Sequence, residues 1–344
     1  MSMEALSDEV MLRIFAPLSG TALLDVVPLV CKRWQKLSRD PRAWEGVAVW
    51  GREYCRTEAE KETPPVDARV LLHAPAVRRI NIGSQWDRWM VSAFTRSKAV
   101  VLHKLYFDAI GWKILPRAAR VALLDMLWRS RDCVREVHSL QFDKGDEAAA
   151  AGGPLRDSEG RSPLAILAQL KRLHALGLDM DEGYPYAREL AAGFPELREL
   201  QVNTYRAAKL PELLTVDLLT AVAPTLRDVD LHGDLPPPPV MLKALSKCKS
   251  LRQVRAHDKV MNSLRGMQHI EEMTIFVWQD SRVSNRVKAI LEVCQTLGKL
   301  FKLNLNIWSS YRGTSRQVEQ AECKRHIRAY ERKKMSDVNL RMGW

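Results

Sequence analysis

The sequence lacks the features by which enzymes and metalloproteins are most often recognised. It contains no glycine-rich phosphate-binding loop, no G-x-S-x-G motif and no H-E-x-x-H motif. Its eight histidines are isolated from one another, and its six cysteines show no paired spacing. Such cysteine usage is typical of a reducing compartment, so we expect a protein of the cytosol or the nucleus. We expect no catalytic site, no metal and no cofactor.

Long hydrophobic runs are absent as well. No stretch approaches the ~18 apolar residues of a membrane span, and the first residues lack the basic start and apolar run of a signal peptide. Hydrophobic residues make up 46% and charged residues 27% of the chain, which is typical of a globular protein. The net charge is +12. An excess of this size favours contact with nucleic acid or with an acidic protein surface.

Residues 6–44 predict three short amphipathic helices. Ser7 is a good N-cap, and the two acidic residues after it suit the first turn of a helix. Val10 and Ile14 then recur at helical spacing, and Pro17 marks the end or a bend of the first helix.

A second helix is expected to start near residues 19–21. Pro28 is expected to open a third helix, which would place Val30, Trp34 and Leu37 on one face and basic residues on the opposite face. A unit this short falls near the size, roughly 40 residues, below which a chain rarely buries enough surface to fold alone. Its apolar faces therefore predict more than one neighbour, although packing against this chain alone remains the alternative.

The order L-S-D-E-V, I-F-x-x-L, L-V-C-K-R-W and D-P-x-x-W resembles an F-box, with Ser7 where that family usually has proline. The resemblance implies that this segment docks on the Skp-type adaptor of a cullin–RING ubiquitin ligase. The positions that would meet the adaptor, with the last closing the module, are Leu6, Glu9, Val10, Ile14, Leu18, Leu23, Val30, Cys31, Trp34 and Trp44.

A strand pattern of the form apolar-x-x-apolar-x-apolar recurs through the rest of the chain. Its later copies begin at Leu173, Leu197, Leu226, Leu251, Ile270 and Leu300, and upstream copies at more irregular intervals begin at Val77, Leu102 and Val137. The later intervals are 19 to 30 residues, close to the 20–29 residues of leucine-rich repeats. Helical segments are expected between them, at 186–194, 211–223, 240–247, 260–267 and 285–297.

This order favours an α/β fold in which a three-helix F-box precedes an irregular leucine-rich-repeat solenoid, or horseshoe. The alternative, a doubly wound fold, would require longer apolar strands and a glycine-rich first turn. The predicted parts are an F-box at 1–50, a linker at 51–76, a degenerate repeat domain at 77–311 with a disordered insertion at 144–163, and a basic helical tail at 312–344.

Alternation within the repeat strands locates a candidate binding surface, because the residues between the buried positions point outward. The outward positions that we predict to hold a substrate are Tyr205, His232, Arg255, His257, Phe276, Trp278, Asn304, Asn306 and Trp308. The aromatic members form a plausible anchor patch. Equally, the chain from Tyr311 onward could fold back over Phe276, Trp278 and Trp308 as a cap.

Two other groupings contain residue types that occur in catalytic or metal sites. Asp228, Asp230, His232 and Asp234 cluster at one strand end, but we interpret them as outward positions of one repeat. Cys323 and His326 lie three residues apart, yet a structural zinc requires four ligands.

The sequence as a whole resembles an F-box protein with leucine-rich repeats, which implies a non-catalytic substrate receptor of a ubiquitin ligase. The alternative is a repeat scaffold that binds an acidic protein or nucleic acid outside a ligase.

Overall fold

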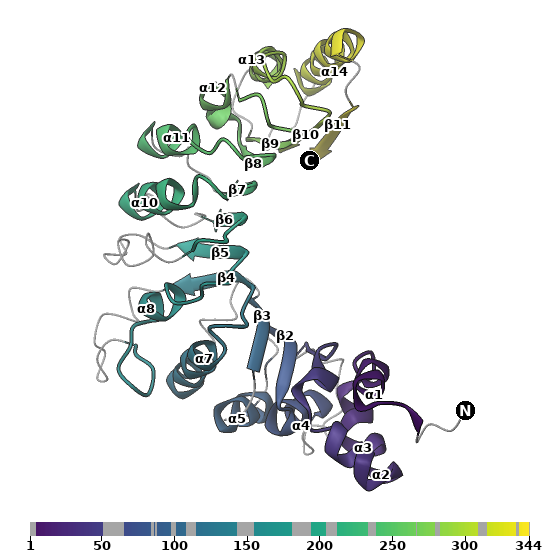
Figure 1. Cartoon of the computed structure of the whole chain (residues 1–344). Coiled ribbons are helices and arrows are strands. Elements are labelled where there is room, and N and C mark those ends of the chain that lie inside the picture. Colours follow the sequence, from purple (N-terminus) through teal and green to yellow (C-terminus); the bar gives the residue numbers. More distant parts are fainter. Residues whose placement is uncertain are drawn as a thin grey trace. The chain divides into compact units, whose positions relative to one another are not determined.

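The structure is a computed structural model, and it divides into two compact units, residues 1–176 and 177–344 (Figure 1). It describes residues 5–50, 65–83, 86, 88–97, 101–107, 115–142, 155–180, 194–203, 212–232, 239–265, 267–278, 283–308, 315–334 and 337–343. Both units are built from parallel strands joined through helices, so the fold is mixed α/β.

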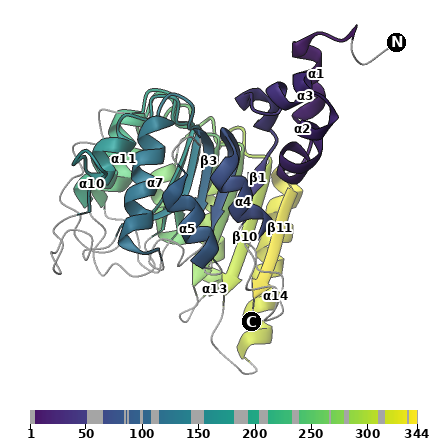
Figure 2. The ribbon, with the colours of Figure 1, turned by 90° about the horizontal axis from the view of Figure 1, so that it is seen from below.

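Unit 1 begins with a group of short helices, which Figure 2 shows together: α1 (Asp8–Phe15), η2 (Ala22–Val26), α2 (Val27–Val30), α3 (Lys32–Leu37) and η3 (Pro41–Trp44). Helix α1 starts as predicted, since the Ser7 side chain accepts a hydrogen bond from the Val10 amide at 3.4 Å. The predicted third helix is wrong in its extent. Cys31 is extended (φ −164°, ψ 168°), so it separates Pro28 and Val30 from the helix that carries Trp34.

The rest of unit 1 is a parallel sheet with helices along one face (Figure 1). Strands β1 (Ala48–Val49), β2 (Ala76–Ile82), β3 (Val101–Phe107) and β4 (Glu136–Phe142) follow one another in chain order, and β5 (Ala175–Met180) crosses the boundary between the units. The helices are α4 (Val66–His73), α5 (Arg88–Arg96), α7 (Arg117–Arg129) and α8 (Pro163–Leu167).

Two segments predicted to be irregular are ordered where the structure describes them. The predicted linker contains helix α4. The last part of the predicted disordered insertion is a turn around Asp157, which is 6% exposed and accepts a hydrogen bond from the Arg161 amide at 2.7 Å. The Arg161 guanidinium lies 3.9 Å from the ring centre of Trp128, so this turn is held against helix α7. Residues 51–64 and 143–154 lie outside the described part of the chain.

Strand β4 contains a local irregularity at Ser139. Ser139 has a positive φ of 54°, a backbone conformation uncommon for residues other than glycine. It adds one residue between Val137, which is fully buried, and Leu140, which is 2% exposed. The extra residue acts as a β-bulge, and it returns Leu140 to the core.

Unit 2 continues the alternation of strand and helix. Its strands β6 (Glu199–Asn203), β7 (Asp228–His232), β8 (Gln253–His257), β9 (Glu272–Trp278), β10 (Lys302–Trp308) and β11 (Asp337–Gly343) are parallel and in chain order. Between them lie α10 (Glu212–Val222), α11 (Pro239–Leu245), η6 (Asp258–Val260), α12 (Met261–Leu264), α13 (Val283–Cys294) and α14 (Ser315–Lys334).

All the predicted strands are confirmed, and their leading apolar residues are buried. The predicted helical segments at 211–223, 240–247 and 285–297 correspond to α10, α11 and α13, and a shorter helical segment, η6 with α12, occupies 258–264. The predicted helix at 186–194 lies outside the described residues, apart from Phe194. Among the described residues, no helix combines the length and the apolar character that crossing a membrane requires.

The predicted helical tail is wrong in its second half, because its last residues form strand β11 in parallel register with β10. Helix α14 lies beside α13 and buries Cys323, Ile327 and Tyr330. Helix α14 and strand β11 therefore extend the two layers of unit 2 by one further helix and one further strand (Figure 1). The Val338-x-Leu340-x-Met342 alternation is the sequence signal for that strand.

Candidate functional site

The helical segment of unit 1 exposes large apolar side chains. Val10 is 42% exposed, Ile14 39%, Val26 60%, Leu29 83% and Val30 55%. Only Trp50, Val240 and Phe301 are comparable among the other described residues. Apolar side chains gathered in one short segment mark an interaction surface far better than isolated ones do. We call these five residues the helical apolar patch.

Local structure explains why these side chains are exposed. Val10 and Ile14 are one helical turn apart on α1, whereas Met11, Leu12 and Phe15 turn inward and are buried. The other three patch residues come from a continuous apolar run around Pro28, too short and too uniformly apolar for one face of a helix to bury.

Two sets of contacts hold α1 and α3 together. Trp34 packs edge-on against Phe15, with ring centres 5.2 Å apart, and so joins α3 to α1. Arg33 donates a hydrogen bond to Asp8 at 2.9 Å and another to the Leu6 carbonyl, and so holds the start of α1 against α3.

Several predicted adaptor contacts are placed differently from the prediction. Leu23 and Trp44 are each 1% exposed, so they belong to the core and offer no surface to a partner. The Trp44 indole donates a hydrogen bond to the Ser38 carbonyl at 2.6 Å. Trp44 is therefore an internal residue of the segment, and η3, which carries it, lies beside both α1 and β2.

The remaining predicted adaptor residues are accessible to different extents. Glu9 is exposed and forms an ion pair with Arg13 at 2.8 Å. Cys31 is exposed, and Leu6, Leu18 and Trp34 are partly buried. Sequence reasoning missed Val26 and Leu29 as surface residues. Both stand in the apolar run beside Pro28, which was the available signal.

Residues 5–49 match the family model described as F-box-like. The chain therefore carries an F-box-like domain, and F-box domains generally bind Skp-type adaptors. No curated protein matches the chain.

The predicted substrate face in unit 2 is described only in part. Arg255 is exposed, whereas Phe276, Asn304 and Asn306 are half-buried, and the Asn304 amide donates a hydrogen bond to the Thr274 hydroxyl at 3.3 Å. Tyr205, Asp234 and the side chains of His232, Trp278 and Trp308 lie outside the described residues. Among the aromatic residues predicted for the patch, Phe276 alone has a described side chain.

His257 corrects the prediction that every alternate residue points outward. It is 5% exposed, because its side chain turns back to accept a hydrogen bond from the Lys259 amide at 3.3 Å. That contact caps η6, directly after β8. A residue at the last position of a strand can serve the following turn instead of the sheet face.

Among the described acidic residues of this face, Asp230 has the most strongly shifted pKa. Burial raises its pKa to about 6, and the positive charge of Arg255, 3.9 Å away, only partly offsets this. Its Oδ1 atom is buried with no hydrogen-bond partner in the described structure. Burial and the charge of Glu199 also raise the pKa of Asp228. These acids lie on alternate positions of β7, and no group of three or more metal-ligating side chains occurs among the described residues.

Unit 1 has a second outward cluster that sequence reasoning missed. The Arg79 guanidinium lies 4.0 Å from the ring centre of Tyr106, and that ring stacks on His138 at 4.5 Å. Tyr106 donates a hydrogen bond to Glu136 at 2.5 Å, and Lys104 forms an ion pair with the same carboxylate at 2.5 Å. Burial opposes ionisation of Glu136, but these two partners more than offset it and lower the pKa.

Proposed function

We propose that this protein is a non-catalytic substrate-recognition subunit of an SCF-type E3 ubiquitin ligase. The helical apolar patch on an F-box-like domain is the observation that carries the proposal. In this proposal the patch docks on a Skp-type adaptor, which links the chain to a cullin–RING ligase, while the sheet domain holds the protein to be ubiquitinated.

The mechanism we infer is proximity. A bound substrate presents its lysines at high effective concentration to a charged conjugating enzyme on the same assembly, so this chain needs no catalytic group of its own. We further propose that the strand–helix units are leucine-rich repeats. The recurring apolar-x-x-apolar-x-apolar strands and their parallel in-register pairing support this assignment.

Co-purification from cell lysate, with mass spectrometry of the partners, tests the receptor role. The test variant is Ile14→Asp, which places a charge in the patch without removing a core side chain. The matched control is Phe301→Asp, an exposed apolar residue of unit 2. We expect adaptor and cullin with the wild-type chain and with the control only. Retention of both by the Ile14 variant would refute the patch as the docking face.

Trp34→Ala is a weaker test, because its ring packs against Phe15. Loss of binding in that variant would report damage to the helical core as well as loss of a contact.

The second candidate function is a binding scaffold for an acidic protein or a nucleic acid outside any ligase, and the net charge of +12 favours it. Binding to nucleic acid releases counterions, so affinity would fall steeply with salt. A steep salt dependence with RNA or DNA, together with no adaptor binding, would favour the scaffold.

A further inference from the structure

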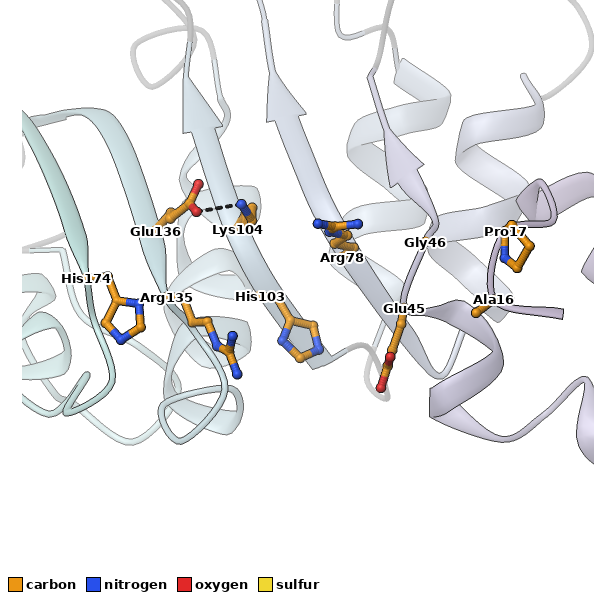
Figure 3. Close-up of a pocket in the computed structure, with 10 residues that line it drawn as sticks. All are labelled: Ala16, Pro17, Glu45, Gly46, Arg78, His103, Lys104, Arg135, Glu136 and His174. Carbon is orange, nitrogen blue, oxygen red and sulfur yellow. Dashed lines mark hydrogen bonds and ion pairs between the residues drawn. The ribbon is translucent and has the colours of Figure 1, made fainter. Parts of the chain in front are cut away.

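Unit 1 contains a cavity of about 700 Å³ whose lining is mainly polar (Figure 3). Its residues come from the end of α1, from the approach to β1 and from the starts of β2 to β5: Ala16, Pro17, Glu45, Gly46, Arg78, His103, Lys104, Arg135, Glu136 and His174. A cavity of this size is in the range of ligand sites, roughly 300–1,000 Å³.

One line of basic side chains runs along the cavity. Arg78, His103, Arg135 and His174 each follow a buried apolar residue at the start of a strand: Val77, Leu102, Val134 and Leu173. The pairing of Val137 with Leu105 shows that Val134, and not Val137, is the leading residue of the β4 copy, so the four basic residues occupy one equivalent position on neighbouring strands. Backbone hydrogen bonds fix the alignment, from Arg135 N to His103 O at 2.8 Å and from His174 N to Arg135 O at 2.7 Å. Since neighbouring strands lie ~4.8 Å apart, the backbone positions of these four residues form a row with that spacing. We call it the strand-start row.

The charges in the cavity leave an excess of positive charge. Lys104 and Glu136 form an ion pair at 2.5 Å and so largely cancel each other. Arg78 and Arg135 are exposed and make no hydrogen bond or ion pair through their side chains within the described part of the chain. Glu45 is the remaining carboxylate of the lining.

The pKa of His103 reflects burial and the positive charge of Arg135 beside it. Its pKa is lowered, chiefly by burial and then by the charge of Arg135, while Glu45 has a smaller opposing effect. An added negative group between Arg78 and Arg135 would relieve this repulsion.

We propose that this cavity binds an acidic peptide segment, with carboxylate or phosphate groups of the peptide paired to Arg78 and Arg135. Guanidinium groups suit this role because they bind both kinds of group in a bidentate manner. Arg78 and Arg135 stand two strands apart, about 9.6 Å at the backbone, so they would engage two separate acidic groups of the peptide.

The lining favours a peptide over a nucleic acid. It includes no Phe, Tyr or Trp on which a base could stack. It also contains Glu45 and Glu136, whose charges oppose a continuous phosphate backbone. This inference rests on the proposed receptor role in one respect, that the ligand is a protein. It adds that the bound segment of that protein is acidic.

Fluorescence anisotropy with the full-length chain measures peptide binding in the absence of any adaptor. A negative result would therefore refute the peptide site without bearing on adaptor docking. The probes are fluorescein-labelled 12-residue Gly/Ser peptides carrying three Asp, three phosphoserines or no acidic residue, and a labelled 12-nucleotide oligothymidine. We expect binding of the aspartate or the phosphoserine peptide, and weaker or no binding of the neutral peptide and of the oligonucleotide.

The variants are Arg78→Gln and Arg135→Gln, each expected to weaken binding of the acidic peptide by about ten- to a hundredfold, because one charge-assisted pair is lost. Arg198→Gln is the matched control, since Arg198 holds the same repeat position in unit 2 but lies outside the cavity. Equal losses in all three variants, no binding of either acidic peptide, or tighter binding of the oligonucleotide would each overturn the proposal. Circular dichroism confirms that the variants are folded.

Discussion

Asp230→Asn should stabilise the protein at neutral pH and do so less at low pH. Asp230 has its pKa raised from 3.8 to about 6 in the folded state. Its protonated form is therefore favoured by folding, and that stabilisation is complete below pH 3.8 and is lost as the pH rises through about 6. A shift of about two units corresponds to roughly 3 kcal/mol, which is the upper limit for the cost of the folded carboxylate above pH 6.

The assay is urea unfolding of the wild-type chain and of the variant at pH 4 and at pH 7.5. Asparagine keeps the shape of the side chain and carries no charge, so we expect its free energy of unfolding to exceed that of wild type by about 1–3 kcal/mol at pH 7.5 and by much less at pH 4. Comparing the two chains at each pH cancels the titration of every other group.

Asp132→Asn is the matched control, because the Asp132 side chain is 77% exposed and the substitution removes the same charge from a basic protein. An equal difference between Asp230→Asn and wild type at both pH values would refute the reasoning. So would an equal gain in the control, since the effect would then come from net charge and not from burial.

Two further substitutions test the packing of the F-box-like domain. Gly46→Ala should lower the free energy of unfolding by about 1–3 kcal/mol, because the added Cβ would lie 2.1 Å from the Ala16 carbonyl oxygen. Thermal unfolding of the variant measures this loss, and a melting temperature equal to that of wild type would contradict the close approach. Trp44→Phe should cost about 1–2 kcal/mol through loss of the hydrogen bond to the Ser38 carbonyl. Because Trp44 is buried, the folded Trp44→Phe variant should bind adaptor as wild type does in a titration at low temperature, and a large loss of affinity would mean that Trp44 contacts the partner.

The strands of both units could be predicted from the sequence, because buried apolar residues at fixed offsets leave few alternatives. Leu200, Val229 and Val254 occupy paired positions on neighbouring strands, and each was identified from spacing alone. The start of α1 was equally accessible, since Ser7 and the two acidic residues after it act through local backbone hydrogen bonds and the helix dipole.

Tertiary contacts explain what sequence reasoning missed. Nothing in the local composition distinguishes buried Leu23 from exposed Leu29, because both stand in the same apolar region, Leu23 in η2 and Leu29 in α2, and tertiary packing decides which of them is covered. His257 was misplaced because its side chain caps the next turn. The strand-start row was missed because its members lie 25 to 39 residues apart in sequence, and only in-register pairing brings them together.

The most direct test of the central proposal is calorimetric titration of a purified Skp-type adaptor into the full-length chain. Leu29→Asp is the decisive variant, since Leu29 is 83% exposed and its loss leaves the core intact. Val240→Asp, at a site that is 51% exposed in unit 2, is the matched control. We predict that wild type and control bind alike and that Leu29→Asp weakens binding at least about 30-fold, the effect of losing one strong interface contact. Wild-type affinity in Leu29→Asp, or no adaptor binding by the wild-type chain, would contradict the proposed docking.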